Sequence, residues 1–572
     1  MPQVKVRNVD AVGIISDILP QDVPPNGFDS GVNVRFADGK VSRANVFRTY
    51  HTYVPPEGSS TVSPVVHLAN LQLASQGDNL FAVHANMKIE QVDGPVEIDV
   101  SPPFAPTSEI LEVPVTSTVL GDVLYVNRQD QLPVYKSNVI TDFTVLPAWN
   151  TQWRTRVLRA YKDFLIAFNV EKNGIEYPTL VKWSDVVLAG APPTSWDETS
   201  TTNSAGETVL SEINGPILDA LPLRNAMMIY SSDEVWQMDY VGGDFIFSFR
   251  RAFKGGGIIN TNCVVDVQGT HFVFGENDIY THDGNTMQSV ADGRVKDFIF
   301  SALNKDLKQF CFAFYSARYQ EVYFCYPSGD PLVQYGNKLP YCNRAAVFNI
   351  KTNTWSFIDM PNALAATLTT VSGSAGLSWN GASTEGLLWS TIGGSWYDLR
   401  DASDRHTVIA SNAFTTDYGT GTFVNYGTSI EAFDRPSRGS QVTLPLSPKC
   451  QPLKSIVQSR YMPMDADGSN IGTVKQFRSL WPIARVSTDT GALKFSFGST
   501  MTPNGGIQWD EVILDDKPFY EYDLPPDFSG YNDYKIDTRI SGRYLSYKVE
   551  VENGEDFEFG GFDVDYISLG RR

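Results

Sequence analysis

The sequence predicts an all-β protein, a β-propeller with a β-sandwich-like platform domain and very little helix. Apolar and polar residues alternate with a period of two in long aromatic runs, as in residues 79–89, 159–170, 226–238, 271–280 and 309–326. Between such runs, Asp-Gly, Asn-Gly and Gly-Gly turn signals recur too often for α/β crossover connections. The length of 572 residues suits about two to four domains.

Residues 1–50 are expected to form an N-terminal arm. The arm carries six basic and five acidic side chains, whereas the whole chain has a net charge of −20. Its arginines and phenylalanines allow two interpretations, a docking surface for a neighbouring subunit or the core of strands. The residues concerned are Arg35, Arg43, Arg48, Phe28, Phe36 and Phe47.

Residues 51–430 are expected to form the propeller. Hairpin-like units follow one another here without a strong linker, and many carry a tryptophan near a turn. A radial stack of small sheets accommodates this length in one domain, and stacked β-sandwiches are the alternative. Residues 347–361 contain one copy of a kelch-like spacing of threonine and tryptophan. The sequences of the units are too divergent for the number of blades to be counted. One helix is expected from Arg294 to Leu307, with Asp292 as its cap.

Residues 431–572 are expected to form a separate C-terminal β-sandwich platform. The boundary is indicated by prolines in the polar stretch 431–452, and short alternating strands follow it.

The charge balance and the apolar pattern exclude several classes of protein. Tight binding of nucleic acid through phosphates needs Lys and Arg, and this chain has an excess of the opposite sign. No apolar run is long enough to span a bilayer, and the first 20 residues show no signal peptide. The cysteines never form a CxxC pair, so buried, reduced thiols made in a cytoplasm are expected at Cys263, Cys311, Cys325, Cys342 and Cys450.

Motifs that carry chemistry are weak throughout the chain. His271 and His282 flank a strand pair that could bring them near Asp278 or Asp283, but no third metal ligand has a recognisable spacing. A turn histidine and a strand histidine packed on aromatic rings is the favoured alternative. Residues 465–470 begin like a calcium loop and then lack its glycine and its final glutamate.

No enzyme motif is complete, so no catalytic, cofactor or metal residue is predicted. Gly255, Gly256 and Gly257 lack the spacing and the lysine of a phosphate-binding loop. Residues 231–239 imitate an Asp-box of sialidases but have Val235 in place of its turn glycine. Glycoside hydrolysis stays the one enzymatic alternative, because it needs only two carboxylates.

Several segments, among them LPQDVPPNGFDSGVNVRFADGKVSRA and VWQMDYVGGDFIFSFR, carry a resemblance to a known family. The chain resembles the tail proteins of short-tailed bacteriophages called DNA stabilisation, tail tubular B or nozzle proteins. The resemblance covers most of the chain through diffuse structural signatures, in residues 19–44, 161–170, 177–185, 192–197, 203–223, 235–250, 272–284, 292–300, 541–550 and 570–572.

The resemblance implies a β-propeller on a platform domain with which residues 1–50 pack. It further implies a homohexameric ring in the virion tail, assembled in the host cytoplasm, below the adaptor ring of the portal, with DNA passing along the ring axis. Tail fibre or spike proteins are further possible partners. Acidic walls fit this role because they repel phosphates instead of holding them, so a set of carboxylates is expected to face the lumen. A carbohydrate-binding or glycan-degrading propeller, tail-associated or secreted, is the alternative function.

Overall fold

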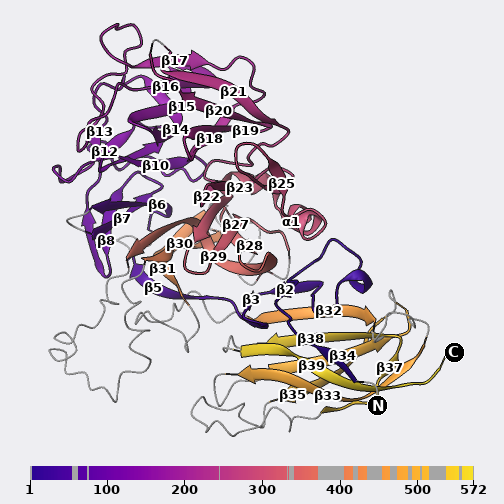
Figure 1. The fold of residues 1–572 in the computed structure, drawn as a ribbon. Coiled ribbons are helices and arrows are strands. Elements are labelled where there is room, and N and C mark those ends of the chain that lie inside the picture. Colours follow the sequence, from indigo (N-terminus) through magenta and orange to yellow (C-terminus); the bar gives the residue numbers. More distant parts are fainter. Residues whose placement is uncertain are drawn as a thin grey trace, which may run out of the picture.

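The structure is a computed structural model that confirms the all-β class. It describes residues 3–53, 62–73, 77–243, 245–330, 333, 340–370, 405–416, 423–434, 454–463, 473–486, 493–502, 506–514, 536–552 and 557–570. The described helical elements are one short α-helix, α1 (Lys296–Ala302), and two 3-10 turns, η1 (Pro20–Asp22) and η2 (Lys305–Phe310). All other regular elements are β-strands arranged in a propeller and a platform (Figure 1).

Five four-stranded antiparallel sheets form blades 1 to 5 of the propeller, and within each sheet the strands pair in chain order. The first strand of each blade contacts the first strand of the next, so these strands surround the propeller axis. The strands are β6 (Val65–Leu73), β7 (Gly77–His84), β8 (Ile89–Asp93) and β9 (Val96–Asp99) in blade 1; β10 (Val115–Leu120), β11 (Val123–Arg128), β12 (Val134–Lys136) and β13 (Thr144–Val145) in blade 2; β14 (Trp153–Tyr161), β15 (Phe164–Lys172), β16 (Ile175–Trp183) and β17 (Gly206–Val209) in blade 3; β18 (Ile217–Leu223), β19 (Ala226–Ser231), β20 (Glu234–Tyr240) and β21 (Phe247–Lys254) in blade 4; and β22 (Val264–Val267), β23 (Thr270–Phe274), β24 (Ile279–His282) and β25 (Met287–Ser289) in blade 5.

A seven-stranded sheet supplies blades 6 and 7. Its long strand β29 pairs with β28 through its first part and with β30 through its last part, and it contacts both β26 and β6. It is therefore the outer strand of blade 6 and the inner strand of blade 7. The strands, in sheet order, are β26 (Phe312–Ser316), β27 (Glu321–Tyr326), β28 (Cys342–Asn349), β29 (Thr354–Thr370), β30 (Arg405–Thr416), β31 (Phe423–Asp434) and β5 (Val46–Thr52).

Apolar side chains fill the interfaces between successive blades of this seven-bladed ring. Several of these interfaces bury a cluster of their own, for example the one around Trp149 and Trp196 between blades 2 and 3. The ring closes where Tyr50 of β5 and Ile430 of β31 pack with Leu68 of blade 1. Burial of these clusters is the dominant favourable term in folding, so closure by an N-terminal strand ties the arm to propeller stability.

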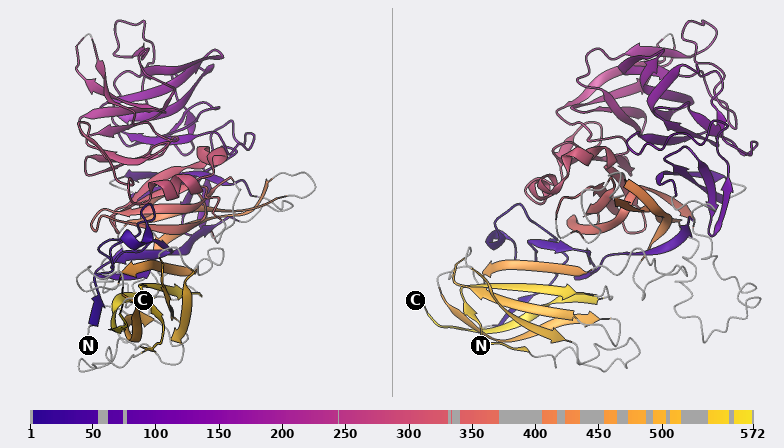
Figure 2. Two further views of the ribbon diagram at one scale, coloured as in Figure 1. Left: turned by 90° about the vertical axis from the view of Figure 1, so that its right-hand side faces the viewer. Right: turned by 180° about the vertical axis from the view of Figure 1, so that it is seen from behind.

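The platform is a two-layered sandwich built from both ends of the chain, and Figure 2 shows it beside one edge of the propeller. One sheet has the order β3-β4-β39-β33-β36, with β1 also paired to β39 and β37 to β33; the other has the order β2-β32-β38-β34-β35. Rings from the two sheets meet between the layers, as where Tyr547 and Phe562 lie 4.9 Å apart. The strands are β1 (Gln3–Val6), β2 (Ser30–Val32), β3 (Val34–Ala37), β4 (Lys40–Arg43), β32 (Ser455–Pro463), β33 (Lys475–Val486), β34 (Leu493–Thr500), β35 (Gln508–Leu514), β36 (Ile536–Asp537), β37 (Ser541–Gly542), β38 (Tyr544–Val551) and β39 (Phe557–Ser568).

The arm joins the platform to blades 5 and 6. Backbone N–H groups of Ile14 and Asn33 donate to the carbonyls of Trp355 and Phe357 in β29, at 3.0 and 2.7 Å. The core is continuous across this junction, because platform residues and blades 4 to 6 share one apolar cluster. The arm that supplies platform strands ends before β5, a few residues short of the expected boundary at residue 50.

The expected helix from Arg294 to Leu307 is shorter and capped differently. It spans seven residues, and Asp292 does not cap it. Instead Asp17 of the arm accepts hydrogen bonds from the backbone N–H groups of Asp297 and Phe298 at 2.9 and 3.1 Å. The cap is a tertiary contact from a residue 280 positions away, which local periodicity does not reveal.

Candidate functional site

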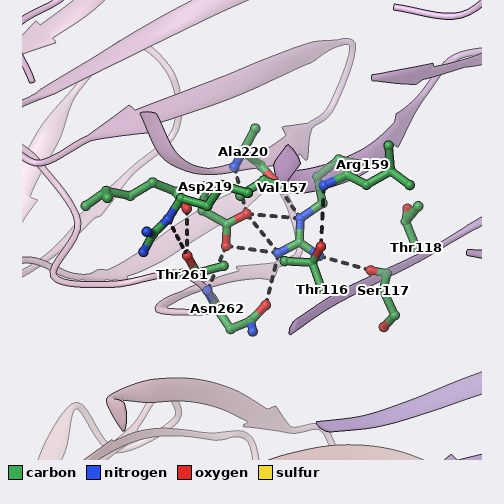
Figure 3. Close-up of polar contacts among 12 residues, drawn as sticks. Thr116, Ser117, Thr118, Val157, Arg159, Asp219, Ala220, Thr261 and Asn262 are labelled. Atoms are coloured by element: carbon green, nitrogen blue, oxygen red, sulfur yellow. Dashed lines mark hydrogen bonds and ion pairs between the residues drawn. The ribbon is translucent and has the colours of Figure 1, made fainter. Parts of the chain in front are cut away.

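A buried ion pair occupies the centre of the propeller (Figure 3). The Arg159 guanidinium of β14 donates to both carboxylate oxygens of Asp219 in β18, at 2.8 to 3.0 Å. It also donates to the Ser117 carbonyl of β10 and to Oδ1 of Asn262, each at 3.0 Å. Asp219 in turn accepts from the Asn262 backbone N–H at 2.8 Å. We call these four residues the hub.

The hub joins blades 2, 3, 4 and the start of blade 5. Asn262 Nδ2 donates to the Val115 carbonyl at 2.9 Å, a bond between blades on opposite sides of the ring. Arg156 of blade 3 likewise reaches Asn260 Oδ1 at 3.3 Å. Among the described residues, hydrogen bonds between blades 2 to 5 therefore cross the centre of one copy and form a polar core there.

The two histidines singled out in the sequence do lie together, as cross-strand partners in β23 and β24. Their rings are 5.3 Å apart, and the Tyr230 hydroxyl lies 2.5 Å from Nδ1 of His271 and 2.7 Å from Nε2 of His282. Nε2 of His271 lies 3.0 Å from the Pro222 carbonyl. The cluster sits at the buried interface of blades 4 and 5, so the structure favours histidines packed on aromatic rings.

The carboxylates expected near these histidines are engaged elsewhere. Asp278 accepts from the Ser289 hydroxyl at 2.9 Å, and Asp283 accepts from backbone N–H groups of its own turn. Burial lowers the pKa of His271 to about 4; burial and the neighbouring His271 lower the pKa of His282 to about 3. Both rings are therefore neutral near pH 7. Within the described residues, no group of three His, Cys, Asp or Glu side chains could hold a metal ion.

The three consecutive glycines line a cavity of about 580 Å³ between blades 4 and 5. A Cβ on Gly257 would lie 1.7 Å from the Ser232 carbonyl oxygen, so close backbone approach requires glycine there. Four carboxylates line the cavity, but most have internal partners: Glu234 accepts from Trp236 Nε1 at 3.0 Å, and Glu276 pairs with Lys308 at 2.7 Å. The four are Asp233, Glu234, Glu276 and Asp278.

The arm does not present the aromatic docking surface that was one interpretation of its sequence. Phe28, Phe36 and Phe47 are buried in the platform and in blades 6 and 7. Arg35 is held by Glu321 of β27 at 2.7 Å. The alternative interpretation, strand core, is confirmed for these phenylalanines.

Of the five cysteines, the four described ones are buried free thiols, as expected. Burial raises the pKa of Cys263, Cys311, Cys325 and Cys342, which makes their thiolates scarce. Cys450 and the turn at residues 465–470 lie outside the described residues. In the part of the chain that the structure describes, no helix is long and apolar enough to cross a bilayer.

No family model matches the chain, and no curated protein matches it. Solved structures that align with it include two crystal structures of BBS1N in complex with ARL6DN, one soaked with mercury and one with lead. Each alignment covers 71% of this chain and 100% of that chain at 9% identity, with TM-scores of 0.34 and 0.35. Similarity at this level assigns no family and no function.

Proposed function

We propose that the chain is a structural protein of a bacteriophage tail. Copies of it form a ring, the nozzle, below the portal and adaptor, and the ring retains DNA in the particle and lets it pass at ejection. The sequence resemblance to nozzle proteins of short-tailed phages is the starting point. The observation that carries the proposal is that strands β1 to β4 and strands β32 to β39 pair in the sheets of one platform. The resemblance implies the same arrangement, a platform with which residues 1–50 pack.

The hub constrains how such a ring must work. Because hydrogen bonds of Arg159, Asp219 and Asn262 cross the centre of each propeller, DNA cannot thread a single copy. The passage must lie between copies, along the symmetry axis of the ring. A net charge of −20 suits a wall along which a polyanion slides without being held.

The proposal is tested by measuring mass and by examining particles. Native mass spectrometry of the purified chain, alone and mixed with its adaptor ring, should give a closed oligomer, for which the resemblance implies six copies. Antibodies against the chain should label the tail of intact particles. A chain that is missing from particles would contradict the proposal.

A glycan-binding or glycan-degrading propeller is the second candidate, and the cavity beside Gly257 is the observation that favours it. The cavity has the size of a small-molecule site, and its carboxylates and amides could bind sugar hydroxyls. Incubation of the chain with capsular polysaccharide separates the two candidates, because a glycan-degrading enzyme releases oligosaccharides and a ring protein releases none.

A further inference from the structure

The outer strand of each of blades 1 to 5 ends its sheet with an edge that pairs with no other strand in the described part of the chain. Two of these outer strands carry exposed side chains of opposite charge. They are β9 of blade 1 and β21 of blade 4. An open edge presents a row of backbone N–H and C=O groups that can pair with another chain. Blades 2 and 3 separate the two strands on one side and blades 5 to 7 on the other, so they face opposite directions from the axis (Figure 1).

The edge at β9 is acidic and apolar. All four of its side chains are exposed, and Val96 and Ile98 are 55% and 54% exposed. Glu97 and Asp99 alternate with them and point to the opposite face of the sheet. The Glu97 carboxylate lies 3.0 Å from Nε2 of His51 in β5, and its side chain is still 47% exposed. Exposed β-branched residues on an edge strand favour pairing with another strand, and natural proteins normally avoid them.

The edge at β21 is basic. It carries Arg250, Arg251 and Lys254, all exposed, and no carboxylate. Arg251 pairs with Glu234 of β20 at 3.3 Å, and its side chain is 48% exposed. The side chain of Arg250 is 57% exposed, and its ion pair with Asp239 is long, at 3.6 Å. Its guanidinium therefore has donors available for a carboxylate on another molecule.

Apolar side chains extend the basic edge at the tip of the β20–β21 hairpin. Phe245 is 80% exposed, and Tyr240 and Val241 beside it are also exposed. Gly242 and Gly243 at the tip have positive φ angles, so the turn projects these side chains from blade 4. Exposed aromatic anchors next to arginines are typical of protein interfaces.

We propose that the β20–β21 hairpin of one copy docks against β9 of a second copy of this chain. Edge strands β21 and β9 pair, and Arg250 lies on the face of Glu97 and Asp99. Arg251 and the hairpin tip lie on the other face, over the exposed apolar residues of β9. This contact would join neighbouring copies in the ring of the proposed function. The inference rests on the proposed function only in assuming that successive contacts close into a ring.

A second copy is the occupant because one chain carries both halves of the contact. The charges are of opposite sign, both edges offer backbone groups, and each half has exposed apolar side chains. Because the halves lie on opposite sides of the propeller, the contact is head-to-tail. Such contacts repeat from copy to copy and give a ring when the rotation closes.

Charge reversal tests the contact on the full chain. Sedimentation velocity up to about 100 µM measures association of the natural chain, of Arg250→Glu/Arg251→Glu and of Glu97→Lys/Asp99→Lys. The natural chain should associate beyond the dimer, and each variant should have its dissociation constant raised at least about 100-fold. The matched control is Lys305→Glu/Lys351→Glu, which reverses two exposed cations elsewhere and should leave association unchanged.

A mixture of the two reversed variants gives the sharper result. In Arg250→Glu/Arg251→Glu both edges are acidic, and in Glu97→Lys/Asp99→Lys both edges are basic. Neither variant should assemble alone, whereas in the mixture copies of the two variants should alternate in the assembly. Recovery in the mixture also shows that both variants are folded. Failure of the mixture to assemble, when circular dichroism shows folded proteins, would overturn the proposal.

Cross-linking checks the pairing of the strands. With Cys450→Ser in every variant, Ile98→Cys and Ser248→Cys in the same chain should give a ladder of dimers, trimers and higher oligomers with a short bis-maleimide, whereas each single variant should give none. Dimers from Ile98→Cys alone would show a symmetric contact and overturn the head-to-tail arrangement.

The outcomes separate this proposal from the proposed function. Rings that persist in particles or with the adaptor after both charge reversals would refute the edge contact and leave the tail function standing. Head-to-tail assembly of a chain that is missing from particles would leave the contact standing and refute the tail function. A chain that stays monomeric at every concentration and binds only other proteins would refute the contact.

Discussion

Replacing Arg159 by methionine removes the cation from the hub and leaves the Asp219 carboxylate buried. Three hydrogen bonds from the guanidinium to Asp219 are lost, and the hydrogen bonds that remain to the carboxylate come from the Asn262 and Ala220 backbone N–H groups. Breaking a buried ion pair in this way costs about 3–5 kcal/mol. The Ser117 carbonyl also loses its guanidinium donor, so the upper part of that range is expected.

Urea unfolding followed by tryptophan fluorescence measures this cost. Arg159→Met/Asp219→Asn should be more stable than Arg159→Met by about 1–3 kcal/mol, because the amide removes the buried charge and keeps an acceptor for Asn262. Lys308→Met, which breaks the half-exposed pair with Glu276, should cost less than about 1 kcal/mol. If Arg159→Met cost no more than that control, the hub would not be a desolvated core, and the axis would be open to water.

Three further predictions concern folding. The pKa values of His271 and His282 lie below the ordinary value near 6.5, so these rings bind protons at a higher pH in the unfolded chain than in the folded chain. The free energy of unfolding should therefore fall as the pH drops from about 6.5 to about 4, by up to about 1.4 kcal/mol per pH unit for each ring. Melting curves of His271→Gln/His282→Gln should show a flatter pH dependence, and an unchanged slope would refute this account. Asp17→Ala removes the cap of α1 and should cost about 0.5–2 kcal/mol in urea unfolding, and no measurable loss would mean that the arm does not hold the helix. Gly257→Ala places a Cβ against a backbone oxygen and should cost about 3 kcal/mol or more in the same assay, whereas Gly506→Ala, with open space around its Cβ, should be nearly neutral; equal costs would contradict the packing described here.

The sequence predicts the class of fold well because period-two alternation and turn dipeptides are local signals. The helix from Arg294 was predicted too long because its cap, Asp17, lies on a distant arm. The number of blades could not be predicted, because β29 serves two blades and β5 closes the ring from the other end of the chain. Both features depend on long-range pairing, which periodicity does not encode.

The sequence indicates only some residues of the candidate sites. The histidine pair in β23 and β24 was visible as two histidines across a predicted hairpin, whereas its third member, Tyr230, comes from another blade. The hub was missed, although Asp219 interrupts the apolar strand β18; Arg159 is one of three arginines in β14 and does not stand out there. The isolated carboxylate inside β18 is the signal that could have indicated a buried pair, because charged residues are almost never fully buried unless paired.

The central claim is that copies of this propeller surround a DNA passage that lies between them. Electron cryo-microscopy of intact particles tests it most directly. The account predicts a closed ring of this chain in the tail, with DNA density on the ring axis, acidic side chains toward the lumen and filled propeller centres. A particle tail without the chain, or a ring whose inner wall is strongly basic, would contradict it.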